Sequence, residues 1–220
     1  MLSLFHTVQI LAYPAEDIKY QAQISSFFLS QSQASLLHCP PRSYRSRIVP
    51  EFELYGTVKA IVSVCDSVNY ILEEEELEEV FRLVNNYLDP GGVFIFDFNT
   101  VYKYREILGD QTIAENREEC SFIWDNYYYE EERINEYELS LFIREEDSEL
   151  YRKYQETHFQ KAYDLETMKR LITQSGLEYI TAYDAFTKEA PTKASERIYV
   201  IEEKEGNNDE RLYCKSNSGK

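Results

Sequence analysis

Residues 57–99 read TVKAIVSVCDSVNYILEEEELEEVFRLVNNYLDPGGVFIFDFN, and this stretch decides the fold. Its first part, TVKAIVSVC at 57–65, predicts a buried strand. Residues 74–88 then place apolar side chains at helical spacing and glutamates on the other face, which predicts an amphipathic helix. The Asp-Pro-Gly-Gly sequence at 89–92 predicts the end of that helix, and 93–99 predicts a second buried strand. The stretch therefore predicts a β-α-β unit.

Polar residues follow the carboxyl ends of both predicted strands. In chain order they are Cys65, Asp66, Ser67, Asn69, Tyr70, Asp97 and Asn99. In open α/β sheets ligands bind at this edge, so these residues are the first candidates for a site. An alternative is that Asp66 and Ser67 only cap the segment after them, and that Asp97 and Asn99 cap the segment that begins near Val101.

The chain before this unit has a different character. Residues 1–55 contain no glycine, and 1–50 carry a net charge of +2 whereas the remaining 170 residues carry −19. Periodicity is poor up to the proline- and arginine-containing stretch at 38–50. We expect a boundary near residue 50, a main domain at 51–202 and a disordered tail at 203–220. Residues 1–50 form a disordered appendage, a divergent segment or a frameshifted segment foreign to the ancestral reading frame.

Composition excludes several classes of function. A net charge of −17 argues against a nucleic-acid or anionic membrane partner, because phosphate binding needs lysine and arginine. The four cysteines, at 39, 65, 120 and 214, lack the spacing of a zinc site or a disulfide framework, so a cytoplasmic protein is expected. No apolar run approaches the 18 residues that a transmembrane helix needs, so none is expected. The glutamates at 73–76 cannot converge on one ion, so no metal site is expected.

Residues 112–163 predict an antiparallel meander, because apolar and aromatic side chains alternate along 120–128, 137–143 and 150–163. Asp164 then offers an N-cap to a helical stripe at 165–172, and Gly176 is a good stop for that helix. Two further strands are expected near 178–184 and 196–202. The expected class is α/β, with the meander inserted into the sheet.

This ordered series resembles a known family. CDSVNY at 65–70, LDPGG at 88–92, FIFDFN at 94–99, YDLETMKRLITQSGLEYI at 163–180 and SERIYVIEEK at 195–204 are similar to the C-terminal two thirds of class I S-adenosylmethionine-dependent methyltransferases. The small bacterial, Firmicutes-type group is the nearest in character. The resemblance implies an incomplete Rossmann-like methyltransferase sheet, in which this chain supplies the fourth to seventh of seven strands.

The resemblance also implies S-adenosylmethionine as the cofactor, with Cys65, Asp66 and Ser67 beside it. The family's glycine-rich loop and the acidic residue after its second strand have no counterpart in 1–55, where neither Glu16 nor Asp17 follows a convincing strand. We therefore expect cofactor binding to be weak or lost. The fourth strand would also have an open edge, which favours oligomers unless 1–13 or 24–29 covers it.

Residues near the same edge are candidates for the methyl acceptor, a small molecule or a protein. They are Asn69, Tyr70, Asp97, Asn99, Trp124, Tyr127 and His158. The last three lie on the meander, which resembles a lid over the substrate, although aromatic rings on a sheet more often serve packing alone. His158 is the sole histidine after residue 50 and is a candidate general base, or else a structural residue. No single catalytic residue is assigned.

Three functions compete. The first is S-adenosylmethionine-dependent methyl transfer, which the ordered series favours. The second is a non-catalytic methyltransferase remnant that acts as an interaction protein, which the glycine-free start favours. The third, a small-ligand binder built on the aromatic meander, leaves the α/β portion unexplained.

Overall fold

The computed structural model of the chain describes residues 10–13, 56–145, 148–185 and 187–206. Its elements in chain order are β1 (Ile10–Tyr13), β2 (Val58–Ser63), the 3₁₀ turn η2 (Ser67–Tyr70), α2 (Glu74–Tyr87), β3 (Leu88–Asn99), the π-helical turn η3 (Lys103–Leu108), β4 (Thr112–Asn116), β5 (Cys120–Tyr129), β6 (Ile134–Arg144), β7 (Tyr151–Lys161), α3 (Leu165–Gln174), β8 (Leu177–Asp184) and β9 (Arg197–Lys204).

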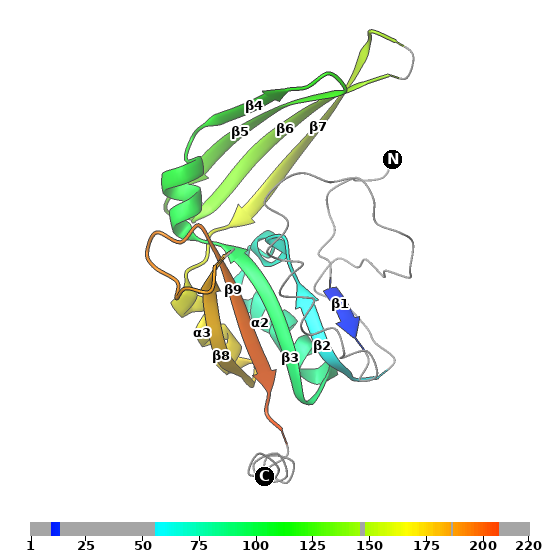
Figure 1. The fold of residues 1–220 in the computed structure, drawn as a ribbon. Helices are drawn as coiled ribbons and strands as arrows, with labels where there is room; N and C mark the ends of the chain where they lie inside the picture. Colours follow the sequence, from blue (N-terminus) through cyan, green and yellow to red (C-terminus); the bar gives the residue numbers. More distant parts are fainter. Residues whose placement is uncertain (1–9, 14–55, 146–147, 186, 207–220) are drawn as a thin grey trace.

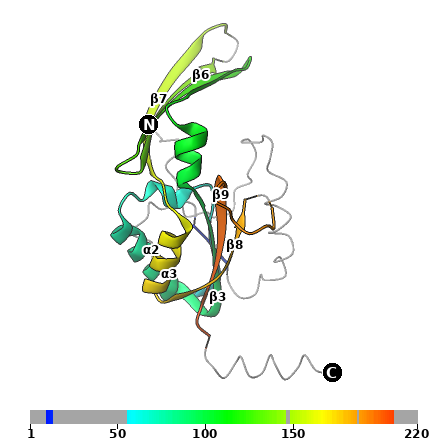
Figure 2. The same cartoon turned by 90° about the vertical axis from the view of Figure 1, so that its left-hand side faces the viewer.

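Five strands form a mixed sheet in the order β1-β2-β3-β9-β8. β2 and β3 are parallel and are joined through α2, so the predicted β-α-β unit is confirmed. β9 is antiparallel to both β3 and β8. Figure 2 shows α2 and α3 on one side of this sheet. Because β2 and β3 are parallel neighbours, their carboxyl ends meet at one edge of the sheet.

The main core lies between the sheet and the two helices. The buried residues of α2 are Leu77, Val80, Phe81 and Val84, which are the i, i+3, i+4 and i+7 positions of the predicted stripe. β3 turns alternate phenylalanines toward them, and the rings of Phe81 and Phe96 lie 5.3 Å apart between centroids. Asp164 caps α3 as predicted, since its carboxylate accepts from the amide of Thr167 at 2.8 Å.

The tetrapeptide 89–92 does not form a separate turn between helix and strand. β3 begins at Leu88, which pairs with Val58, and the ladder resumes where Val93 pairs with Ala60. Residues 89–92 are therefore an irregularity inside β3. Gly91 has the left-handed φ of 72° that such a bend requires.

The edge of β2, which was expected to be open unless 1–13 or 24–29 covered it, is covered by β1. Residues 10–13 pair with β2 in antiparallel register, from Ile10 opposite Ser63 to Tyr13 opposite Ala60. The sequence left this pairing open for 1–13, because a short apolar segment does not reveal its partner. β2 is therefore an inner strand of the described sheet, and β1 and β8 are its outer strands.

The remaining strands form a separate antiparallel sheet, β4-β5-β6-β7, which confirms the predicted meander. Figure 1 shows it standing beyond the carboxyl ends of β2 and β3. The sequence predicted three strands here and did not indicate β4, because Thr112–Asn116 is mostly polar and lacks an apolar alternation. It also missed η3, which joins β3 to the meander.

Two predictions at the ends of the chain fall largely outside the described residues. These are the disorder of 207–220 and the irregular structure of 1–50 apart from β1. Glu203 and Lys204, which were predicted to belong to the tail, complete β9 instead. In the described parts of the chain, every helix is too short or too polar to span a bilayer.

Candidate functional site at the carboxyl edge of the mixed sheet

The chain leaves β2 through a tight turn at the predicted edge. Cys65 and Asp66 both adopt left-handed backbone conformations, with φ of 65° and 50°. A left-handed conformation costs a residue with a side chain about 1–2 kcal/mol, so other contacts must hold the turn. One of them is the amide of Asp66, which donates to the Asp97 carboxylate at 2.8 Å.

Arg197, at the start of β9, binds the acidic residues at the ends of both parallel strands. Its Nη2 lies 2.7 Å from Asp66 Oδ1 and its Nη1 lies 2.9 Å from Asp97 Oδ2. Its Nε donates to Asn99 Oδ1 at 3.1 Å. One guanidinium therefore fixes the ends of β2 and β3 relative to each other, and a planar fork suits this task.

The charges in this cluster are strongly coupled. Burial raises the pKa of Asp97, and the Arg197 guanidinium and the Asp66 amide oppose that rise. Burial would lower the pKa of Arg197, but Asp66 and Asp97 together raise it above its ordinary value. Cys65 is exposed at the surface, but its thiol is partly buried. This burial raises the pKa of the thiol, and the negative charges of Asp97 and Asp66 raise it further. The thiol is therefore a weak nucleophile at neutral pH.

Asn69 is fully buried and acts as a clamp between three elements. Its Nδ2 donates to the carbonyl of Asn99 at 2.9 Å and to that of Lys161 at 2.7 Å, and its Oδ1 accepts from the amide of Asn99 at 2.8 Å. It thereby ties η2 to the end of β3 and to the end of β7. These hydrogen bonds give Asn69 a structural role, whereas the sequence analysis suggested that it contacts the methyl acceptor.

A closed ring of side-chain hydrogen bonds joins the meander to the same edge. Gln160 of β7 donates to Asp66 at 2.7 Å and accepts from the Tyr104 hydroxyl at 3.0 Å. Asn99 donates to that hydroxyl at 3.2 Å and binds Arg197, which returns to Asp66. Tyr104 is fully buried and Gln160 nearly so. The lid-like sheet is thus fixed to the sheet edge by polar contacts.

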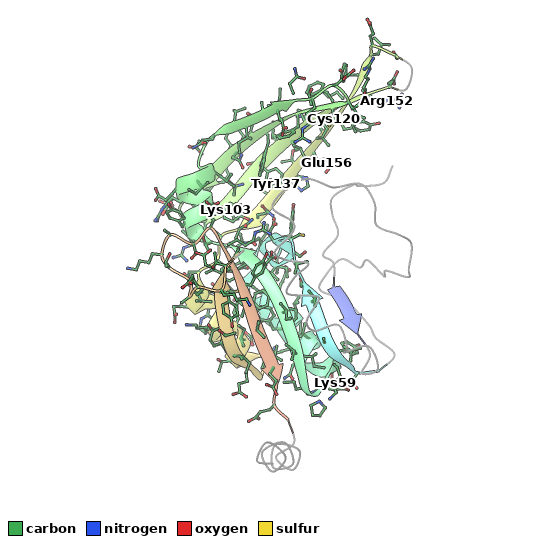
Figure 3. The ribbon with its side chains drawn as sticks, in the orientation of Figure 1. Lys59, Lys103, Cys120, Tyr137, Arg152 and Glu156 are labelled. Atoms are coloured by element: carbon green, nitrogen blue, oxygen red, sulfur yellow. The ribbon has the colours of Figure 1, made fainter. Side chains whose placement is uncertain are left out.

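Tyr70 and His158 meet on the meander side of the edge. The hydroxyl of Tyr70 lies 2.7 Å from that of Tyr137 and 3.3 Å from His158 Nδ1, and His158 Nε2 lies 3.2 Å from Glu156. The Tyr137 and His158 rings stack at 4.6 Å, and Trp124 packs edge-on against Tyr137. Figure 3 shows Tyr137 at the end of the meander nearest the mixed sheet.

The phenols of this cluster stay protonated in the physiological range. Burial, followed by the contact with Tyr70, raises the pKa of Tyr137. Burial likewise raises the pKa of Tyr70. These hydroxyls can therefore donate, accept or relay a proton, but they do not act as phenolate bases.

The structure brings most of the sequence-predicted residues together at the edge, and the exception is Tyr127. Ser67 turns inward, where its hydroxyl donates to the carbonyl of Val64 at 2.7 Å. Tyr127 pairs with Glu136, which in turn pairs with Phe159, so it lies on the face of the meander opposite to that of Tyr137 and His158, and it is 44% exposed. Tyr127 is therefore not brought to the edge.

Five residues of the site were not singled out from the sequence: Tyr104, Tyr137, Glu156, Gln160 and Arg197. Arg197 carried a usable signal, since it is the one base in the strand expected near 196–202. Gln160 and Tyr104 gave none, because their contacts depend on how the meander folds back over the edge.

A cavity of about 320 Å³ lies beside this cluster. It is lined by Lys103, Asp184, Ala185, Ala194, Glu196 and Arg197. Burial and the nearby Arg197 lower the pKa of Lys103. Across the described residues there is no grouping of three or more histidine, cysteine or acidic side chains fit to hold a metal ion.

The described residues fit one wall of the implied cofactor site but not its cradle. Cys65 is exposed beside the carboxyl end of β2, where the resemblance expects the cofactor. The carboxylate and amide of Asp66 and the hydroxyl of Ser67 are all bonded within the chain. The glycine-rich loop of the cradle is expected before this unit, where residues 1–55 contain no glycine.

Known proteins with similar sequences are methyltransferases by description. A "Putative methyltransferase GWCH70_2453" of Geobacillus sp. (strain WCH70) is 32% identical over 154 residues, which are 70% of this chain and 62% of that protein. A "Putative methyltransferase YqeM" of Bacillus subtilis (strain 168) is 29% identical over 149 residues. The chain spans about 60% of the length of these curated relatives. No protein-family model matches it.

Solved structures give the same result. A crystal structure of an S-adenosylmethionine-dependent methyltransferase from Clostridium acetobutylicum ATCC 824 matches with a TM-score of 0.67 and 26% identity, covering 86% of this chain and 72% of that one. The CcbJ methyltransferase from Streptomyces caelestis shares the fold with a TM-score of 0.61 at 12% identity, covering 72% of this chain and 66% of that one. In sequence and in fold, the chain is a homologue of the S-adenosylmethionine-dependent methyltransferases over about 70% of its length.

Proposed function

We propose that the chain binds S-adenosylmethionine at the carboxyl edge of β2 and β3 and belongs to an enzyme that transfers its methyl group to a small molecule or a protein. One observation carries this proposal: the polar residues that the family resemblance expects at the ligand edge gather there in three dimensions. Asp66, Asp97 and Asn99 meet on Arg197, with Asn69 and Tyr70 on the next turn.

The cofactor would supply a methyl group activated by its sulfonium: the acceptor would take the methyl carbon by in-line attack, with S-adenosylhomocysteine as the leaving group. The chain's own residues would mainly position the reactants and exclude water. Cys65 would line the cofactor side, and Tyr70, Tyr137 and His158 would face the acceptor. Since Tyr70 contacts both Tyr137 and His158, the two hydroxyls can pass a proton from the acceptor to the imidazole, with Glu156 beside its other nitrogen.

A second function is favoured by a specific observation. The polar groups of Asp66 and Ser67 expected at the cofactor are already bonded within the chain, and residues 1–55 offer no glycine. A non-catalytic methyltransferase remnant would have these properties. It would keep the sheet, bind no cofactor and act, if at all, through protein contacts.

Calorimetry with S-adenosylhomocysteine distinguishes the two functions. Loss of two or three charge-assisted hydrogen bonds, at about 1.5–3 kcal/mol each, weakens a site by roughly a thousandfold. If a complete site binds in the micromolar range, we expect this chain to bind with a Kd in the millimolar range. Titrations therefore need ligand at several millimolar.

A matched pair of substitutions locates that binding. Cys65→Met adds bulk at the exposed wall of the site and is expected to abolish the binding heat. Cys120→Met makes the same change near the far end of the meander (Figure 3) and is expected to leave the heat unchanged. The absence of heat from the unaltered chain at saturating ligand would support the remnant instead.

A further inference from the structure

The turn at 64–67 is held in its conformation by contacts from elsewhere in the chain. It contains consecutive left-handed residues, Cys65 and Asp66, and no glycine. The 3₁₀ turn that follows has no side-chain N-cap hydrogen bond. The contacts that fix Asp66 come from Asp97, Gln160 and Arg197, which lie 31, 94 and 131 residues away in sequence.

Arg197 is the central member of this set. It joins the ends of three strands, because it starts β9 and binds acceptors from the ends of β2 and β3. Its side chain is 19% exposed, and that of Asp97 only 2%, so the ion pairs are weakly screened by water. One carboxylate oxygen of Asp97 accepts a hydrogen bond from Arg197, and the other accepts one from the amide of Asp66.

We propose that Arg197 is the positioning residue that shapes the cofactor-side turn of this site. This inference rests on the function proposed above. Through Asp97, the guanidinium sets the position of the Asp66 amide, and through Asp66 Oδ1 it sets the direction of the carboxylate. A lysine cannot replace it, since one ammonium cannot reach three acceptors in one plane. Arg197 also lines the adjacent cavity, so it lies between the turn and the space beside it.

Cys65 reports on this arrangement without any cofactor. Its thiol lies in the field of Asp97, Asp66 and Arg197, and of these the arginine alone favours the thiolate. Arg197→Met should therefore raise the midpoint of the pH profile for alkylation of Cys65, and Asp97→Asn should lower it. Alkylation at Cys65 is followed by mass spectrometry of its peptide, and exposed Arg152→Met on the meander is the control.

Hydrogen exchange tests the positioning itself. In Arg197→Met, exchange of the peptide spanning 64–70 is expected to rise at least tenfold while exchange in β8 stays unchanged. Arg197→Lys should give an intermediate value, because it keeps the charge and loses the fork. If a folded Arg197→Met or Arg197→Lys variant left both the midpoint and the exchange of 64–70 at wild-type values, the proposal would be overturned.

The two proposals fail separately. Neither alkylation nor exchange uses the cofactor, so an absence of S-adenosylhomocysteine binding would overturn the proposed function and leave the role of Arg197 in the turn standing. If Arg197→Met does not fold, Asp97→Asn and Arg197→Lys test the proposal instead. An unchanged midpoint of Cys65 alkylation in both variants would refute the role of Arg197.

Discussion

Replacing Asn69 by alanine is expected to lower the free energy of unfolding by about 3–6 kcal/mol. The change removes three hydrogen bonds at a fully buried site and leaves the amide and carbonyl of Asn99 and the carbonyl of Lys161 without that partner. Each buried polar group left unpaired costs about 1–3 kcal/mol. Urea unfolding followed by circular dichroism measures the loss.

Asn86→Ala provides the control, because Asn86 is exposed on α2 and the same atoms are deleted. We expect that change to be neutral or slightly stabilising, since alanine favours helix. Equal effects of the two substitutions would contradict the clamp. The clamp also predicts that Asn69→Ala loosens the join between η2 and β7, which increases proteolysis near Lys161.

Replacing Glu202 by glutamine is expected to remove a pH dependence of stability. Glu202 lies on β9 with 0% exposure, opposite Phe94 and Tyr179, and neither of its carboxylate oxygens has a hydrogen-bond partner within the described part of the chain. Burial raises its pKa well above the ordinary value of 4.5. The folded state therefore holds this proton where the unfolded chain has released it.

The direction follows from proton linkage. Where the folded state binds more protons than the unfolded state, stability falls as the pH rises. The loss begins above the unfolded pKa near 4.5 and continues up to the raised folded pKa, at about 1.4 kcal/mol per pH unit. Glutamine has no such proton, so the free energy of unfolding of the variant should rise relative to that of the wild type by about this amount per pH unit between pH 5 and 7.

Denaturant titrations at several pH values between 5 and 7 test this expectation. Glu205→Gln, at an exposed position beyond the same strand, should follow the wild-type curve. Parallel curves for Glu202→Gln and the wild type would show that Glu202 is already ionised in the folded chain.

The α/β portion was predictable because its signals are local. The stripe of α2, the apolar run of β3 and the cap at Asp164 depend on neighbours within a few residues, and each appears where the pattern placed it. β5 to β7 were predicted in the same way from alternation, although β6 begins at Ile134, before the predicted 137–143, and β7 ends at Lys161, within the predicted 150–163. β1 was only one of two options, because pairing with β2 depends on a segment about fifty residues away.

The site was predictable in location but not in its internal chemistry. Residues after β2 and β3 were placed at the ligand edge by topology alone. What the sequence did not reveal is that Arg197 binds both Asp66 and Asp97, and that Asn69 hydrogen-bonds to the backbone of Asn99. These partners lie between 30 and 131 residues apart in sequence, so no local pattern encodes them.

The proposed cofactor site at the carboxyl edge of β2 and β3 can be tested by nuclear magnetic resonance. Amide chemical shifts of the labelled chain are recorded during titration with S-adenosylhomocysteine to several millimolar. We expect the shift changes to concentrate at 64–70 and 97–99 and to saturate with a millimolar Kd. A spectrum unchanged throughout, or shifts confined to the outer face of the meander around Tyr127, would contradict it.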